Sequence, residues 1–256
     1  MARSARRLRT VRSVRYTRGG LGVGPGRSGG APSPLSLVSW RQAFWAGDPL
    51  LGLADGASVS SWRDAGALGS PAIQGTPANQ PTFRASTAAF GGRPTVQFDG
   101  GDLLVSSPAG AAQAQPISVV VVGQVTDLGT GSVRLFCDGI SAARMALGSY
   151  QTGTKWRLIA SSALDVGASD TSVHLLHAVL NGASSQVWED NTSAGTGTTG
   201  AAVSPTGMTI GASYLGGNQL VGHVAFIGWY VGDITAAAGW AQFKQWVRSH
   251  YGLTVA

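Results

Sequence analysis

The segment that most constrains the fold is the run ISVVVVGQV, which occupies residues 117–125. It is almost continuously apolar, and its β-branched valines favour extended backbone. A strand with one solvent-facing side alternates apolar and polar residues, whereas this run does not. The run therefore predicts a strand that is buried on both faces.

Several other short runs have the composition of strands, and turns that contain Gly or Asp separate most of them. The chain holds 38 glycines, a single glutamate and only two lysines. Because Glu and Lys are favourable on exposed helices, their scarcity argues against an all-helical protein. We expect further strands over residues 95–98, 103–105, 132–137, 155–160, 173–180, 185–188, 208–211 and 220–231.

Alternation assigns faces within two of these predicted strands. His174 and His177 are three residues apart, so they are expected on opposite faces and make a poor metal-binding pair. In the last strand the alternation places His223, Ala225, Ile227, Trp229 and Val231 on one face, and Val224, Phe226 and Tyr230 on the other.

One helix is predicted close to the C-terminus. Thr235 is a suitable N-cap, and residues 236–238 would begin the helix. An apolar stripe follows at spacings of three and four, formed by Trp240, Phe243, Val247 and Tyr251, and Gly252 can end the helix. Many strands and one late helix predict an all-β sandwich.

Four stretches of the chain carry a family resemblance, in a matching order and spacing. They are VSSWRDA at residues 59–65, NQPTF at 79–83 with GGRPTVQFDG at 91–100, IG at 210–211 before LVGHVAFI at 220–227, and HYGL at 250–253. On these motifs residues 50–253 resemble the laminin-G-like branch of the concanavalin A-like lectin/glucanase superfamily. Phe226 departs from the pattern, because the family often has Glu there.

The resemblance implies a jelly-roll sandwich of two antiparallel sheets. Modules of this branch are similar to those in tail, fibre and capsid-associated proteins of bacteriophages and in secreted glycan-binding proteins. The resemblance does not cover residues 1–34. Enzymes of the superfamily carry a Glu-x-Asp-x-x-Glu run, which this chain lacks.

The N-terminal residues differ in charge from the rest of the chain. Eight of the eighteen basic residues lie within the first 30 residues, which contain no acid, so the remainder has ten basic against twelve acidic groups. We expect a basic anchoring arm over residues 1–18, a Gly/Pro/Ser-rich linker over 19–34 and one β-sandwich domain over 35–256. The arm's arginines are Arg3, Arg6, Arg7, Arg9, Arg12, Arg15 and Arg18.

Most of these arginines recur every three residues, the period of a polyproline-II helix, which predicts an extended arm with an arginine row. Such an arm could dock on an acidic protein surface, for example a capsid shell. A disordered basic tail and an Arg-rich transit peptide are alternative interpretations. Nucleic-acid binding is not expected, because only the arm is basic.

The candidate sites for chemistry are sparse. Glycoside hydrolysis needs two carboxylates across the scissile bond, and the lone glutamate, Glu189, is expected at a hairpin turn with Asp190 and Asn191. Calcium could bind to Asp64, Asp99 and Asp102, but no dense acidic loop is present, and the favoured interpretation is that these acids cap turns and pair with Arg63 or Arg93. No other cofactor is expected.

Sugar binding usually uses aromatic platforms, and the candidates are Trp156, Trp188, Tyr214 and Tyr230. Each could instead be a core residue, and Trp156, between Lys155 and Arg157, is expected to be the most exposed. The only cysteine, Cys137, is expected to be a buried small hydrophobe.

The first eight residues lack the apolar core of a secretory signal, and no apolar run is long enough for a membrane helix, so neither ordinary export nor membrane insertion is expected. We predict a non-enzymatic structural protein of a bacteriophage virion, in head decoration or as a minor tail protein. It would be anchored to a capsid or tail protein by its arm, be present in many copies, and display a sandwich for weak adhesion to a host surface glycan. The alternatives are a free carbohydrate-binding lectin, with or without calcium, and a glycosidase.

Overall fold

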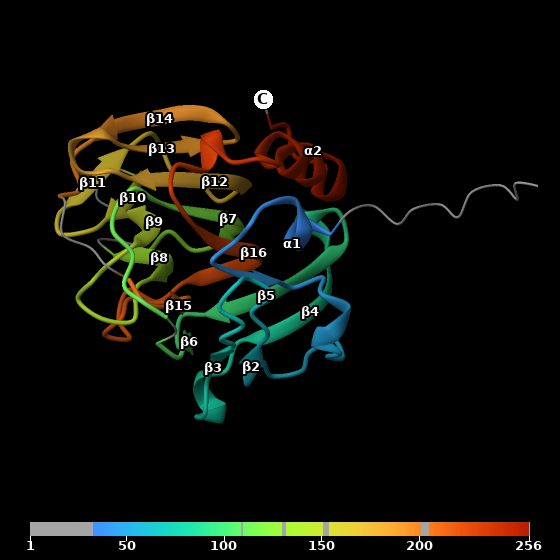
Figure 1. Ribbon diagram of the computed structural model, residues 1–256. Helices are drawn as coiled ribbons and strands as arrows, with labels where there is room; N and C mark the ends of the chain where they lie inside the picture. Colours follow the sequence, from blue (N-terminus) through green and yellow to red (C-terminus); the bar gives the residue numbers. More distant parts are fainter. Residues whose placement is uncertain (1–32, 109, 130–131, 151–153, 201–204, 256) are drawn as a thin grey trace, which may run out of the picture. The chain divides into compact units, whose positions relative to one another are not determined.

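The computed structural model describes residues 33–108, 110–129, 132–150, 154–200 and 205–255, and these form two antiparallel β-sheets with a helix near the C-terminus (Figure 1). The predicted all-β class, with two antiparallel sheets and one late helix, is confirmed. The anchoring arm and its arginines lie outside the described residues.

The first sheet has the strand order β14-β13-β12-β7-β16-β5-β4. Its eighth strand, β1, pairs with β16 in addition to the neighbours that this order gives. All of its pairs are antiparallel. Its strands are β1 (Gln42–Trp45), β4 (Thr82–Thr87), β5 (Arg93–Asp99), β7 (Ile117–Val125), β12 (Val173–Leu180), β13 (Ser185–Glu189), β14 (Thr192–Gly197) and β16 (Val221–Val231).

The second sheet has the order β11-β10-β9-β8-β15-β6-β3-β2. Its strands are β2 (Ser61–Trp62), β3 (Ala72–Ile73), β6 (Leu104–Ser106), β8 (Val133–Asp138), β9 (Ala146–Tyr150), β10 (Lys155–Ile159), β11 (Ala163–Val166) and β15 (Thr209–Ile210). Short 3-10 helices occupy Pro49–Leu51, Pro77–Asn79, Ala88–Phe90, Gly182–Ser184 and Ile234–Ala236.

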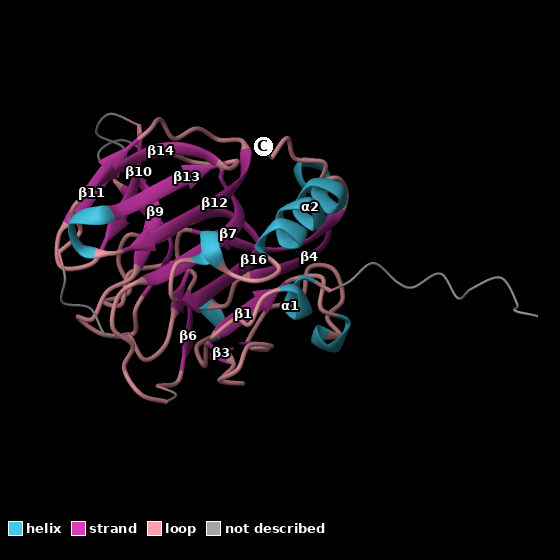
Figure 2. Ribbon diagram, turned by 45° about the horizontal axis from the view of Figure 1, so that its top comes forward, coloured by secondary structure: helices cyan, strands magenta, loops and turns pink. Residues whose placement is uncertain are grey.

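Strand β7 lies between β12 and β16 and has one apolar layer on each side, as its sequence predicts. Val119 and Val121 belong to the core between the two sheets, together with Leu147 of β9. Val120 and Val122 face the other way and pack with α2 (Trp240–Tyr251). Figure 2 shows α2 lying against this sheet. Because both faces are covered, no polar residue is needed along most of the strand.

The C-terminal helix begins later than the sequence predicts. Asp233, rather than Thr235, caps a 3-10 turn over Ile234–Ala236. Gly239 follows with a φ of 85°, a left-handed conformation that favours glycine, and α2 starts at Trp240. The predicted apolar stripe is buried, Trp246 joins it, and Gly252 ends the helix as expected. The four-residue α1 (Pro34–Leu37) packs beside α2.

The predicted faces of β16 are wrong over half of its length. A β-bulge between Val224 and Phe226 shifts the register against β7. Val224 therefore joins Ile227 and Trp229 in the core between the sheets, while Ala225 and Phe226 face α2. An extra residue in a bulge reverses the alternation on one side of it. Within the described residues, no helix is long and apolar enough to cross a membrane.

Candidate functional site

A histidine and three carboxylates meet where β12 and β13 of one sheet approach β10 of the other. His174 lies near the start of β12 and Asp170 precedes that strand, while Glu189 ends β13 and Asp190 follows it. We call Asp170, His174, Glu189 and Asp190 the rim cluster. On the opposite face of β12, His177 packs toward α2, so the predicted separation of the two histidines is confirmed.

The turn between β13 and β14 places two of these carboxylates. Asp190 and Asn191 have φ values of 49° and 68°, and Glu189 pairs with Thr192 across them. Asp and Asn tolerate left-handed backbone, and two such residues form a tight hairpin loop. The hairpin predicted from Asp190 and Asn191 is confirmed, and Lys244 of α2 donates a hydrogen bond to Asn191 Oδ1 at 2.8 Å.

Both ring nitrogens of His174 have carboxylate partners. Nδ1 lies 2.8 Å from Asp190 Oδ2 and 3.2 Å from Glu189 Oε1, and Nε2 lies 2.9 Å from Asp170 Oδ1. The imidazole side chain is only 8% exposed. These bonds tie the β13–β14 hairpin and the segment before β12 to one buried ring.

Two further N–H groups fix the orientation of the carboxylates. The indole Nε1 of Trp156, on β10, donates to Glu189 Oε2 at 2.8 Å. The backbone N–H of Leu175 donates to Asp190 Oδ1 at 2.9 Å. Each of these carboxylates therefore has one oxygen held by an N–H donor and the other directed at His174. Trp156 also meets the His174 ring edge to face, with centroids 5.6 Å apart.

The electrostatics of the cluster favour a charged imidazole. Burial alone lowers the pKa of His174, but the hydrogen bonds to Asp190 and Asp170 and the charges of Asp190 and Glu189 outweigh it and raise the pKa to about 9. Burial raises the pKa of Asp170, but the bond to His174 and the N–H of Ser172 leave that pKa below its ordinary value. At neutral pH one imidazolium therefore faces three carboxylates.

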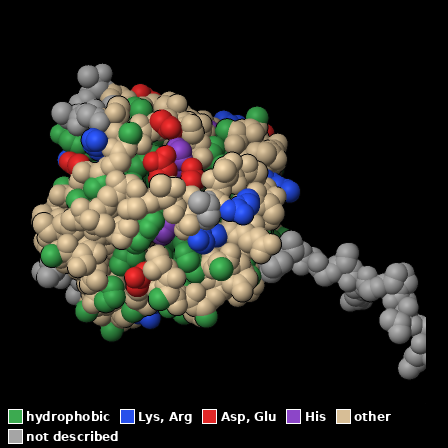
Figure 3. Space-filling view, turned by 90° about the horizontal axis from the view of Figure 1, so that it is seen from above, with side chains coloured by type: hydrophobic (Ala, Val, Ile, Leu, Met, Phe, Trp, Pro, Cys, Tyr) green, Lys and Arg blue, Asp and Glu red, His purple; other side chains and the backbone are tan. Residues whose placement is uncertain are grey.

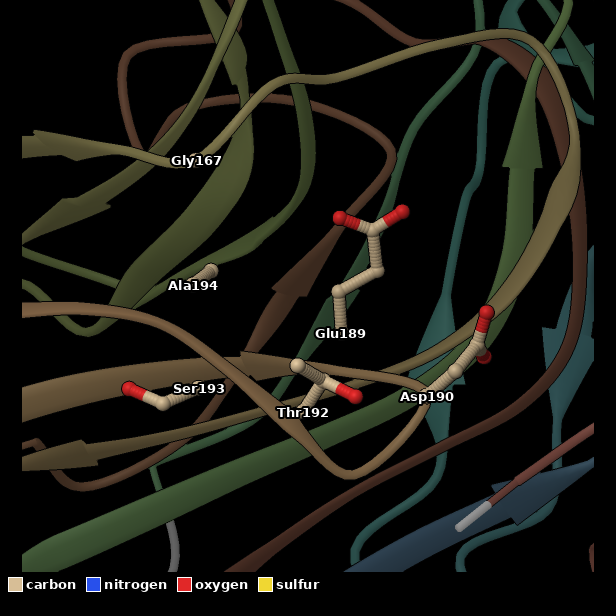
Figure 4. Close-up of a pocket in the computed structure, with 6 residues that line it drawn as sticks. All are labelled: Gly167, Glu189, Asp190, Thr192, Ser193 and Ala194. Carbon is tan, nitrogen blue, oxygen red and sulfur yellow. The ribbon is translucent and has the colours of Figure 1, made fainter.

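A pocket of about 420 Å³ opens beside the cluster, a size suited to a small ligand. Its lining residues are Gly167, Glu189, Asp190, Thr192, Ser193 and Ala194. Figure 4 shows the Glu189 side chain rising from the hairpin toward the segment that carries Gly167. In Figure 3 acidic side chains gather beside histidine on the face seen from above. The pocket is thus lined by carboxylate and hydroxyl oxygens and by the small residues Gly167 and Ala194.

Part of the cluster has the donor set of a metal site. One ligand atom from each of Asp170, His174 and Glu189 can be chosen so that the three lie within 4.8 Å of one another. Among the residues that the structure describes, this is the one such group of three.

The predicted aromatic candidates are not brought together. Trp156 is 1% exposed and lies between the two sheets, so the prediction that it is the most exposed is wrong. Along β10 the flanking Lys155 and Arg157 point away from the core and Trp156 points into it. Trp188 is half-buried and stacks on His177 at 4.7 Å, and half-buried Tyr230 packs toward α2. The ring of Tyr214 lies 5.7 Å from the guanidinium of Arg144.

The aspartates considered for calcium hold turns. Asp64 Oδ1 accepts the N–H groups of Ala43 and Gly66, and its Oδ2 accepts that of Ser70. Asp102 accepts the N–H of Asp99, and burial raises its pKa to about 6.

The two arginines offered as partners for these aspartates bind elsewhere. Arg63 pairs with Asp48, and Arg93 donates to the carbonyl oxygen of His250. Calcium at Asp64, Asp99 and Asp102 remains a prediction.

Sequence reasoning missed the rim cluster because its members come from separate segments. A usable signal was present: His174 lies near the start of one predicted strand and Glu189 directly follows the next one, and antiparallel pairing across a short connection brings these two ends together. Cys137 is buried, as expected.

Comparison with known proteins identifies the fold. No model of a known protein family matches the chain, and no curated protein matches it. Among solved structures, domain 4 of the extracellular arabinanase AbnA from Geobacillus stearothermophilus, in complex with arabinotriose, has a TM-score of 0.53 at 11% identity, covering 81% of this chain and 98% of that one.

Two larger proteins contain a similar domain. The botulinum neurotoxin serotype G binding domain has a TM-score of 0.51 at 7% identity, covering 81% of this chain and 50% of that one. Trypanosoma rangeli sialidase has a TM-score of 0.50 at 14% identity, covering 86% and 33%. This chain thus spans about half of the toxin domain and a third of the sialidase. At these identities the likeness concerns the fold alone, which is a β-sandwich.

Proposed function

We propose that this chain is a non-catalytic carbohydrate-binding module whose sugar site is the pocket beside the β13–β14 hairpin. The observation that carries the proposal is the lining of that pocket: the carboxylates of Glu189 and Asp190 and the hydroxyl groups of Thr192 and Ser193 open on one cavity. Sugar hydroxyls donate and accept hydrogen bonds, and such groups are their natural partners. A similar fold binds arabinotriose in AbnA domain 4.

The same geometry argues against hydrolysis. A glycosidase needs one carboxylic acid that is free to protonate the leaving oxygen. Here both oxygens of Glu189 are engaged, by His174 and Trp156, and both oxygens of Asp190 by His174 and Leu175. Each oxygen keeps a second lone pair for a sugar hydroxyl, so these bonds are compatible with binding.

Removing the Thr192 hydroxyl tests the sugar site. Thr192→Val is expected to weaken binding of arabinotriose, or of the strongest glycan on an array, by roughly fivefold to tenfold, because one hydrogen bond of about 1 kcal/mol is lost. Titration calorimetry measures the change. Thr196→Val is the matched control, since Thr196 is also exposed on β14 but does not line the pocket. Folded protein that binds no glycan on the array would overturn the proposal.

We further propose that the module is displayed on a bacteriophage particle, as a head decoration or a minor tail protein, attached by its arginine-rich N-terminus. This placement rests on the charge of residues 1–30. Arginines form bidentate pairs with carboxylates, which suits attachment to an acidic protein surface. Many copies on one lattice would make a weak glycan contact effective through avidity.

Deleting residues 1–34 separates attachment from sugar binding. The truncated chain is expected to be absent from purified virions, as measured by mass spectrometry. Its thermal unfolding and glycan binding are expected to stay unchanged. Full-length protein that is missing from the particles, or truncated protein that still attaches, would refute the placement without touching the sugar site.

A further inference from the structure

We propose that Asp170, His174 and Glu189 form a binding site for one divalent first-row transition metal ion, with Zn²⁺ as the probe. The site goes beyond the proposed function, because it needs no sugar. Its starting point is the spacing already described: three potential ligand atoms within 4.8 Å of one another at the edge of a pocket.

The donor set selects the class of metal. One imidazole nitrogen, which releases its proton to solvent when the ion binds, and two carboxylate oxygens suit ions such as Zn²⁺, which takes three protein ligands and leaves a position open. Ca²⁺ prefers six to eight oxygens and rarely uses imidazole. The open pocket beside Glu189 leaves room for water to complete the coordination. The Asp170 side chain is 57% exposed, so it can adjust its distance to the ion.

The groups around the ligands match those of known metal sites. A metal-bound histidine usually donates its other ring N–H to a carboxylate, which fixes the ring. Asp190, which is not among the proposed ligands, is such a partner and lies 2.8 Å from His174 Nδ1. The Leu175 N–H in turn holds Asp190.

Glu189 is oriented in the same manner. The indole of Trp156, itself 1% exposed, binds Oε2 and leaves Oε1 directed at the cluster. The Ser169 hydroxyl, next to Asp170 in the chain, is buried and has no hydrogen-bond partner among the described residues. Three carboxylates around one imidazole also leave an excess of negative charge, which a divalent cation would neutralise.

Calorimetric titration of the EDTA-treated full chain with ZnCl₂ tests the site. One equivalent is expected to bind, and excess Ca²⁺ or Mg²⁺ is expected not to compete. Asp170→Asn and His174→Gln are each expected to lower the Zn²⁺ affinity at least about tenfold. There are two matched controls. Asp165→Asn changes an acid of β11 that pairs with Arg157 of β10, and His223→Gln changes a histidine outside the cluster.

Each outcome decides the question. Absence of stoichiometric Zn²⁺ binding, unchanged affinity in Asp170→Asn, or equal binding of Ca²⁺ would overturn the proposal. Asp170 is exposed, so its variant tests the site even if His174→Gln unfolds. Because the titration contains no glycan, and glycan binding can be measured in EDTA, failure of the metal site is distinguishable from failure of the sugar site.

Discussion

His177→Phe is expected to raise the free energy of unfolding by about 1–2 kcal/mol at neutral pH, because a buried polar group without a partner costs about that much. The His177 side chain is fully buried, stacked on Trp188 and edge-on to Trp240, and neither of its ring nitrogens has a hydrogen-bond partner in the part of the chain that the structure describes. A phenyl ring keeps both aromatic contacts and has no polar atom to satisfy. For a chain of this size the gain corresponds to a rise in Tm of roughly 2–8 °C.

The same substitution is expected to remove the contribution of His177 to the loss of stability in mild acid, to which His250, whose pKa burial lowers to about 4, also contributes. Burial, helped by the charge of Lys244, lowers the pKa of His177 to about 3, whereas an unfolded histidine titrates near 6.5. The unfolded state therefore binds more protons between these values. Above pH 6.5 His177 is neutral in both states and proton binding does not affect stability; as the pH falls toward 3 the unfolding free energy decreases, by up to roughly 5 kcal/mol.

Urea unfolding of wild type and His177→Phe at pH 7, 5 and 4 measures both effects. For the effect at pH 7 the control is His223→Phe, because His223 already has a partner in Thr95 and its replacement has no such penalty to relieve. His177→Leu covers the case in which the larger ring overpacks the site. If both His177 variants were less stable than wild type and kept its acid slope, the assignment of a buried neutral histidine would be wrong.

His174→Gln is expected to change how the stability of the protein depends on pH in neutral to mildly alkaline solution. The carboxylates around His174 raise its folded pKa to about 9, so the charged ring stabilises the fold fully below pH 6.5, and this stabilisation is lost as the pH rises through 9. This rise in the pKa of His174 corresponds to roughly 3 kcal/mol of stabilisation of the folded state, most of which is lost by pH 9. Wild type is therefore expected to lose stability between pH 6.5 and 9, and the variant to lose much less.

The measurement is the difference in unfolding free energy between the two proteins at pH 6.5, 8 and 9, in buffer with EDTA so that no metal contributes. Both proteins retain the buried Cys137, so its ionisation in the unfolded state cancels in the difference. Asp170→Asn is expected to reduce the drop only in part, because it removes one of the carboxylates that face the ring. A difference that stays constant across this pH range would contradict a charged His174.

Some structure was predictable because it depends on neighbours in the chain. Strand β7 has the bounds that the sequence predicts. A strand that is apolar along nearly its whole length is stable only where both of its faces are buried. The hairpin at Asp190 and Asn191 follows from the left-handed backbone that these residues tolerate. The shortest strands, such as β2 and β3, have two residues each, too few to show any period.

Other features depended on contacts that local patterns do not contain. The bulge in β16 reversed a face assignment because alternation carries no sign of an inserted residue. The helix begins at Trp240 rather than at residue 236, because Gly239 adopts a positive φ that separates the preceding 3-10 turn from α2.

The sequence by itself determined the class of fold, the central strand, the hairpin and the stripe of the last helix, because each follows from backbone preference and apolar period over a few residues. Only the tertiary structure decided where the polar groups meet. Pairing of β12 with β13 brings Glu189 and Asp190 to His174, and packing of the second sheet adds the Trp156 indole. Such a cluster depends on strand register and on the closing of two sheets, and these are settled by burial of the whole core rather than by any short segment.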